Sequence, residues 1–298
     1  MIKRKSLVWF LAITFGMAWI LFLLPLTFRQ NVPASARQLM AVWPWALAMW
    51  APGVAAIIVT TRIDKHSFST LRLNTLGPKR FYLWAWFLPT MLVIVAGILT
   101  VLFGIAQFDP TFQLIRDSMK NAPGAANINP LIVVAAQAAI AILLAPFLNM
   151  LFALGEEIGW RGFLLPHLLP LGQWKALIIT GIIWGIWHAP AIAQGLNYPG
   201  YPVLGIFMMI VFCVLLGIIF GWLYLNTRSP WTTALAHGAV NAVAGLPVLF
   251  LKPGFNMAFG GTLATFPAWV AMIAFIGWLV VSKRLPVEIR QGANVITS

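Results

Sequence analysis

The sequence predicts an all-α, polytopic membrane protein with about eight transmembrane helices. Of the 298 residues, 61% are hydrophobic and 8% are charged, whereas a soluble domain is roughly 45 to 50% apolar and about 25% charged. Apolar stretches close to the roughly 20 residues that one membrane-spanning helix needs also recur along the chain. The composition therefore excludes a water-soluble globular protein.

The first apolar stretch determines how the N-terminal region is interpreted. It follows Lys3, Arg4 and Lys5 and resembles a signal peptide, but its apolar part of about 23 residues exceeds the usual 7 to 15. We therefore expect a retained membrane anchor. Seven further apolar stretches follow. The eight expected transmembrane segments are residues 6–28, 39–60, 82–106, 131–165, 175–193, 203–225, 232–251 and 262–282.

These segments divide the chain into three regions that we expect to form one structural domain. Residues 1–130 hold the first three helices, residues 131–251 hold helices four to seven, and residues 252–298 hold the last helix with a cytoplasmic tail. The longest polar stretch, residues 107–129, contains an Asp109-Pro110 turn signal. We expect it to be a loop outside the membrane.

The net charge of +13 could indicate nucleic-acid binding, but its distribution indicates membrane topology. With the N-terminus inside, fourteen of the 19 Lys and Arg residues fall on the cytoplasmic side, as the positive-inside rule expects. We predict a multi-pass cell-membrane protein with both termini cytoplasmic, with membrane lipid as a partner and without a nucleic-acid partner. The single cysteine, Cys213, excludes an intramolecular disulfide and a zinc–thiolate cluster.

Two of the six carboxylates, Glu156 and Glu157, lie side by side at the end of the fourth apolar stretch. An ionisable pair there is a functional-site candidate, because burying charge in a membrane costs free energy. Helical spacing lets Glu157 pair with Arg161 and leaves Glu156 rotated by about 100° and free. Alternatively, the three residues only mark a helix end at the headgroup level. The other carboxylates, expected to be solvated in loops or the tail, are Asp64, Asp109, Asp117 and Glu288.

Two histidines lie within later apolar stretches, each with a partner four residues away. Trp184 precedes His188 and Asn241 follows His237, and helical geometry places each pair on one face. A turn near Gly172 would bring His188 to the depth of the glutamate pair. One buried histidine is ordinarily a hydrogen-bonded core residue. Two histidines, a glutamate pair and an asparagine together favour a shared polar cavity.

These residue types indicate hydrolysis of a peptide bond by an activated water. A carboxylate and an imidazole can deprotonate a water, and a second imidazole with an amide can donate hydrogen bonds to the oxyanion. No serine- or cysteine-nucleophile signature is evident. A zinc metalloprotease is an alternative, because Glu156 or Glu157 with His188 and His237 forms a two-His, one-carboxylate set. The helical His-Glu-x-x-His motif is missing, so zinc remains an open alternative.

Three short motifs follow one another on successive apolar segments: Glu156-Glu157-x-x-x-Arg161, Trp184-x-x-x-His188 and His237-x-x-x-Asn241. In this order and spacing they resemble the CAAX-protease and bacteriocin-processing (CPBP) family. The resemblance covers about residues 150–245 and makes residues 131–251 a catalytic core. It implies an intramembrane endopeptidase that acts on a membrane-associated peptide or protein, such as a prenylated CAAX-type substrate.

The resemblance also implies a role for each residue of the three motifs. Trp184 departs from the family, which commonly has Phe there, although the indole keeps an aromatic wall. Two other function classes stay open, namely a non-catalytic membrane scaffold or bacteriocin-immunity protein, and a proton-coupled transporter. The implied roles are water activation by Glu156 and His188, oxyanion stabilisation by His237 and Asn241, and organisation of the site by Glu157, Arg161 and Trp184.

Overall fold

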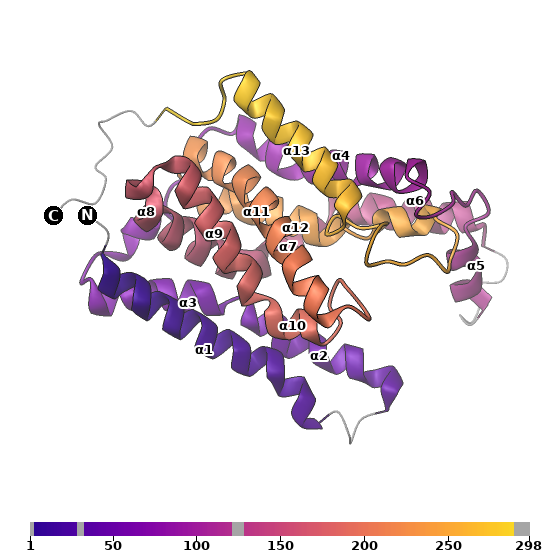
Figure 1. Ribbon diagram of the computed structural model, residues 1–298, viewed down its shortest axis with the longest axis horizontal. Helices are drawn as coiled ribbons and strands as arrows, with labels where there is room; N and C mark the ends of the chain where they lie inside the picture. Colours follow the sequence, from indigo (N-terminus) through magenta and orange to yellow (C-terminus); the bar gives the residue numbers. More distant parts are fainter. Residues whose placement is uncertain (1–2, 29–32, 121–127, 289–298) are drawn as a thin grey trace.

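The computed structural model describes residues 3–28, 33–120 and 128–288 (Figure 1). It confirms the all-α class: in these residues, the extended pairing is limited to one antiparallel bridge between Phe108 and Leu251. Residues 121–127 of the predicted loop and the predicted cytoplasmic tail from residue 289 lie outside the described residues.

The helices follow the predicted apolar stretches, but several stretches bend or break into two helices. The α-helices are α1 (Arg4–Phe28), α2 (Ala34–Ala48), α3 (Ala51–Ile58), α4 (Arg80–Leu102), α5 (Gln113–Lys120), α6 (Pro130–Leu143), α7 (Ala145–Glu157), α8 (Leu165–Leu168), α9 (Gln173–Trp187), α10 (Ala189–Ala193), α11 (Pro202–Thr227), α12 (Pro230–Val243) and α13 (Phe266–Val281). Two π-helical turns, η2 (Val59–Ile63) and η4 (Ile158–Leu164), and three 3-10 turns, η3 (Phe68–Leu71), η5 (Leu169–Leu171) and η6 (Leu246–Phe250), lie between them.

The predicted number of eight spans is not confirmed. Among the described residues, five helices are long and apolar enough to cross a membrane, and α6 with residues 145–171 forms a sixth span if this pair, bent by 44°, is counted as one. The helices α9 and α13 have 15 and 16 residues. In the fifth stretch the helix stops at His188, because Pro190 has no N–H to continue its hydrogen-bond ladder.

Close glycine contacts pack the helices that carry the three motifs. Gly238 of α12 lies against α7, where an added Cβ would be 2.5 Å from the Met150 nitrogen. Gly181 of α9 lies equally close to Val214 of α11. Small residues allow helix backbones to approach closely in membrane proteins. The contacts of α12 with α7 and of α11 with α9 are the most extensive helix contacts in the described residues.

The predicted turn at Gly172 is confirmed and brings the first two motifs together. The chain leaves α7 through η4, α8 and η5 and reaches Gly172, whose φ of +96° favours glycine. Helix α9 then returns into the bundle. Figure 1 shows α8 near the end of the molecule where α1 begins, and α5 at the opposite end.

The sequence predicts that Asp64 and Asp109 are solvated, but in the structure both accept hydrogen bonds from protein groups. Asp64 accepts a 2.6 Å hydrogen bond from the hydroxyl of Ser6 at the start of α1. Asp109 is 2% exposed and accepts hydrogen bonds from Thr111 and from the backbone N–H of Gln113. The Thr111 hydroxyl is the main cause that lowers the pKa of Asp109. Short Asp side chains bond readily to nearby backbone donors, which explains why Asp109 is buried in the loop.

Candidate active site

The two adjacent acids are enclosed by protein at the end of α7. Glu156 is 2% exposed and Glu157 is 0% exposed. The chain does not leave the helical path there, because α7 continues into η4, which carries Trp160 and Arg161. The burial of this segment argues against the alternative in which these residues only mark a helix end.

Glu157 forms the predicted ion pair with Arg161. The Arg161 Nη1 atom lies 2.8 Å from Oε1 of Glu157, and Nδ1 of His237 lies 3.0 Å from the same oxygen. The guanidinium carbon is 4.6 Å from the ring centroid of Trp184 and 5.0 Å from that of Phe220, a cation–π arrangement. Glu157 therefore joins η4 to α12, and both lone pairs of its Oε1 are used by Arg161 and His237.

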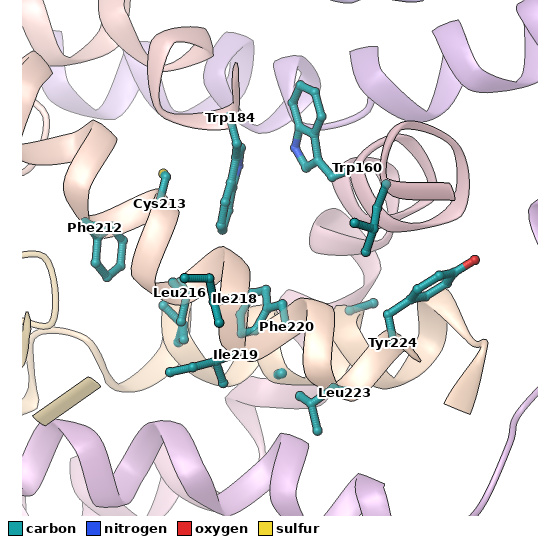
Figure 2. Packing of buried hydrophobic residues seen from close by; sticks show 14 of the residues in the cluster. Trp160, Trp184, Phe212, Cys213, Leu216, Ile218, Ile219, Phe220, Leu223 and Tyr224 are labelled. Atoms are coloured by element: carbon teal, nitrogen blue, oxygen red, sulfur yellow. The ribbon is translucent and has the colours of Figure 1, made fainter. Parts of the chain in front are cut away.

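Glu156 has no ion pair among the described residues, as its predicted rotation away from Arg161 implies, but it is not free of hydrogen bonds. The indole N–H groups of Trp184 and Trp160 donate to its Oε2 at 2.6 Å and 3.1 Å. No hydrogen bond to Oε1 is formed within the described part of the chain. In Figure 2 the ring of Trp184 lies between Cys213 of α11 and the ring of Trp160, and its centroid is 6.0 Å from that of Phe220 of α11. The two neighbouring acids thus have different partners.

His188 caps the end of α9 and is partly buried. Its Nδ1 lies 2.9 Å from the carbonyl oxygen of Trp184. Because a carbonyl can only accept, Nδ1 carries the proton, and Nε2 of the neutral ring is the basic nitrogen. The ring of Trp187 lies 4.7 Å away at 87°, and the Cys213 sulfur lies 4.0 Å from Nδ1. These contacts fix the ring and leave Nε2 to act as a base.

Trp184 is the shared contact of the predicted catalytic side chains. Its indole donates to Glu156, and its ring centroid lies 5.3 Å from that of His237 and 5.9 Å from that of His188. Asn241 differs, because its side chain is exposed and forms no hydrogen bond within the described residues. The structure therefore places Glu156, His188 and His237 around Trp184, while Asn241 lies one turn further along α12.

The zinc alternative does not fit the arrangement of these side chains. In the described residues, no three His, Cys, Asp or Glu side chains form a group that could hold a metal ion, and this includes the predicted set of Glu156, His188 and His237. We therefore derive no chemical step through a metal.

Trp160 belongs to the site although the sequence did not single it out. It donates to Glu156 from four residues further along the chain, the spacing that also predicted the pair of Glu157 and Arg161. Applying this spacing to indole N–H donors would have identified it. Phe220, which covers Arg161 from α11, has no comparable signal, because its contact depends on the packing of separate helices.

Comparisons with known proteins support the family resemblance. Residues 132–243 match the family model for type II CAAX prenyl endopeptidase Rce1-like proteins, and this segment contains every residue of the three motifs. The chain is 35% identical over 105 residues to CAAX prenyl protease 2 of Methanococcus maripaludis. That match covers 32% of this chain and 37% of the relative. The predicted resemblance to the CAAX-protease family is thus confirmed for the segment that carries the candidate site.

Proposed function

We propose, from the likeness of residues 132–243 to type II CAAX prenyl endopeptidases, that this protein is an intramembrane endopeptidase. The observation that carries the proposal is the gathering of Glu156, His188 and His237 around Trp184 inside the matched segment. The proposed substrate is a membrane-associated peptide or protein, and a prenylated CAAX-type chain is the first candidate.

Glu156 and His188 supply two bases for one water molecule. Oε1 of Glu156 and Nε2 of His188 are the basic atoms that the hydrogen bonds to Trp160 and Trp184 leave unoccupied, and either can accept a proton from the water. The water oxygen forms a bond to the peptide carbonyl carbon, and the carbonyl oxygen becomes an oxyanion. As the C–N bond breaks, the proton passes to the leaving nitrogen, so that an acid and an amine are released.

His237 can stabilise the oxyanion when both of its ring nitrogens are protonated. Its Nδ1 lies against Glu157, so the donor toward the oxyanion is the Nε2–H group. Oε1 of Glu157 faces Nδ1 of His237 and also pairs with Arg161, which fixes the direction of the imidazole ring. Asn241 would donate a second hydrogen bond after its exposed side chain turns toward the bound substrate.

The test is peptide cleavage by the full chain in liposomes, with a fluorogenic farnesylated CAAX peptide as the probe. We expect cleavage by the unmodified protein and a loss of at least roughly 100-fold in Glu156→Gln and in His188→Ala. Glu288→Gln is the matched control, because it makes the same substitution at an exposed carboxylate. Cleavage that survives both site substitutions in folded protein would refute the proposal.

A non-catalytic scaffold is a second candidate, because Glu156, Glu157 and His237 all find hydrogen-bond partners inside the protein. Buried polar networks of this kind can stabilise one packing arrangement without chemistry. Glu156→Gln keeps the shape of the side chain and an acceptor oxygen for the indoles. Full biological activity of this variant, without any peptide cleavage by the unmodified protein, would favour the scaffold.

A further inference from the structure

We propose that Trp160 and Trp184 are positioning residues that hold Oε2 of Glu156 between two indole N–H groups and direct Oε1 toward the attacking water. The inference rests on the proposed function, because it assigns one oxygen of Glu156 as the base. It goes beyond the aromatic wall that the motif implies at Trp184, since it depends on the N–H group of each ring and adds a residue from η4.

The geometry places both donors on the same atom. Trp184 and Trp160 donate to Oε2 at 2.6 Å and 3.1 Å, from α9 and from η4, so two separate parts of the chain determine where this oxygen lies. A carboxylate with one fixed oxygen can turn only about the axis through that atom. The second oxygen, Oε1, forms no hydrogen bond among the described residues and is the one left to act on water.

The two indoles are themselves held by packing. Trp160 is 0% exposed and Trp184 is 1% exposed. The ring centroid of Trp160 lies 5.9 Å from those of Phe10 and Trp187, in edge-to-face contacts. The ring of Trp184 contacts both the guanidinium of Arg161, at 4.6 Å, and the ring of His237, at 5.3 Å. Packed rings of this kind cannot change rotamer easily, so the directions of the two N–H bonds are fixed.

Indole is suited to this role because it only donates. A hydroxyl or an amide could rotate and accept a hydrogen bond from a protonated acid, whereas an indole N–H cannot. Hydrogen bonds donated to a carboxylate favour its ionised form. Two indoles on one oxygen therefore favour the form of Glu156 that can act as a base. At residue 184 the commonest residue of the family, Phe, could not contribute a donor.

The charged and titratable groups around Glu156 come from each element packed against it. Glu157 is its neighbour on α7, and Arg161 follows on η4. The remaining groups are Cys213 on α11 and His237 on α12. His188, at the end of α9, contacts Trp184. Because phenylalanine substitutions at Trp160 and Trp184 leave these groups in place, a change in pH dependence reports the loss of the N–H donors.

The experiment measures kcat and KM against pH for Trp184→Phe, Trp160→Phe and the double variant, using the full chain in liposomes and the same farnesylated peptide. We expect the fall of kcat on the acid side to move to higher pH by roughly one unit for each lost donor. KM should change less than about threefold, because neither indole is assigned to substrate binding. Trp269→Phe on α13 is the matched control, since its buried N–H has no partner in the described residues.

An unshifted acid limb in both single variants, or an equal shift in Trp269→Phe, would overturn the inference, because a purely structural role lowers activity at every pH. If the unmodified protein cleaves no peptide, the proposed function fails. A spectroscopic measurement then tests whether the two indole N–H groups act on the Glu156 carboxyl group. Infrared difference spectra against Glu156→Gln then follow protonation of this one carboxyl group. A higher midpoint pH in Trp184→Phe than in the unmodified protein supports the inference, and an equal midpoint overturns it.

Discussion

At the scale of single residues, one carboxylate oxygen organises the charges of the candidate site. Oε1 of Glu157 lies 2.8 Å from Arg161 and 3.0 Å from His237, and the side chains of Glu157 and Arg161 are both 0% exposed. Removing one partner of a buried ion pair leaves the other without compensation, which is more costly than losing an exposed pair. Arg161 should therefore matter for stability as well as for the position of His237.

We expect Arg161→Ala to lower the free energy of unfolding by about 3 to 5 kcal/mol, because Glu157 would remain buried without its cation. Unfolding by a denaturing detergent in mixed micelles measures this change. The control is Lys120→Ala, which removes an exposed ion pair with Asp117 and should cost less than about 1 kcal/mol. If both substitutions lowered the free energy of unfolding by the same amount, the buried pair would contribute no more to stability than the exposed pair.

Spacing within one helix predicted part of this site, and contacts between helices account for the rest. The pair of Glu157 and Arg161 follows from a separation of four residues. The bond between Glu157 and His237 joins residues 80 positions apart and depends on how closely α12 approaches α7. The sequence also predicted Asn241 in the same group, but its place further along α12 leaves it exposed.

At the scale of helices, the contact between α7 and α12 determines whether the three motifs meet. Gly238 follows His237 directly, and a side chain there would collide with the backbone of α7 near Pro146 and Met150. Composition predicted that these segments are helices, but apolar patterning does not show which helices touch. The broken fifth span is a further example, since its apolar stretch continues past His188 while α9 ends there.

We expect Gly238→Val to separate α12 from α7 and to move His237 away from Glu157. Overpacking of a tight contact typically costs about 1 to 3 kcal/mol, so the folded fraction and peptide cleavage should both fall. Thermal unfolding and the liposome assay measure the two effects. Gly277→Val on α13 is the control, because nothing lies within 4 Å of an added Cβ there. A stable and active Gly238→Val variant would contradict this account of the packing.

At the scale of the whole molecule, the arrangement of helices places Lys79 and Lys283 at one end of the bundle. The rings of Trp84 and Trp278 lie 5.9 Å apart, which brings the start of α4 to the end of α13. The opposite ends of these helices meet where Phe103 stacks on Phe266 at 5.2 Å. The helices are therefore antiparallel.

Backbone hydrogen bonds place a further basic residue at the other end of the bundle. The N–H of Lys252 donates to the carbonyl of Gln107, and the N–H of Asp109 donates to that of Phe250. Both bonds lie just beyond the end of α4, on the side where α5 appears in Figure 1. Lys252 and Lys120 thus lie on the side opposite to Lys79 and Lys283. From the positive-inside rule we propose that the end with Lys79 and Lys283 faces the cytoplasm.

Single cysteines can test this orientation, because the natural Cys213 is buried and can be replaced by alanine. Each variant carries one new cysteine, at Lys79, Lys283, Lys120 or Lys252, all of which are exposed. Intact cells are then treated with a membrane-impermeant maleimide. We expect labelling at Lys120 and Lys252 before permeabilisation, and at Lys79 and Lys283 only afterwards, because the reagent cannot reach the cytoplasmic face. The reverse pattern would place the termini outside, and labelling of Lys79 without Lys283 would contradict the antiparallel arrangement of α4 and α13.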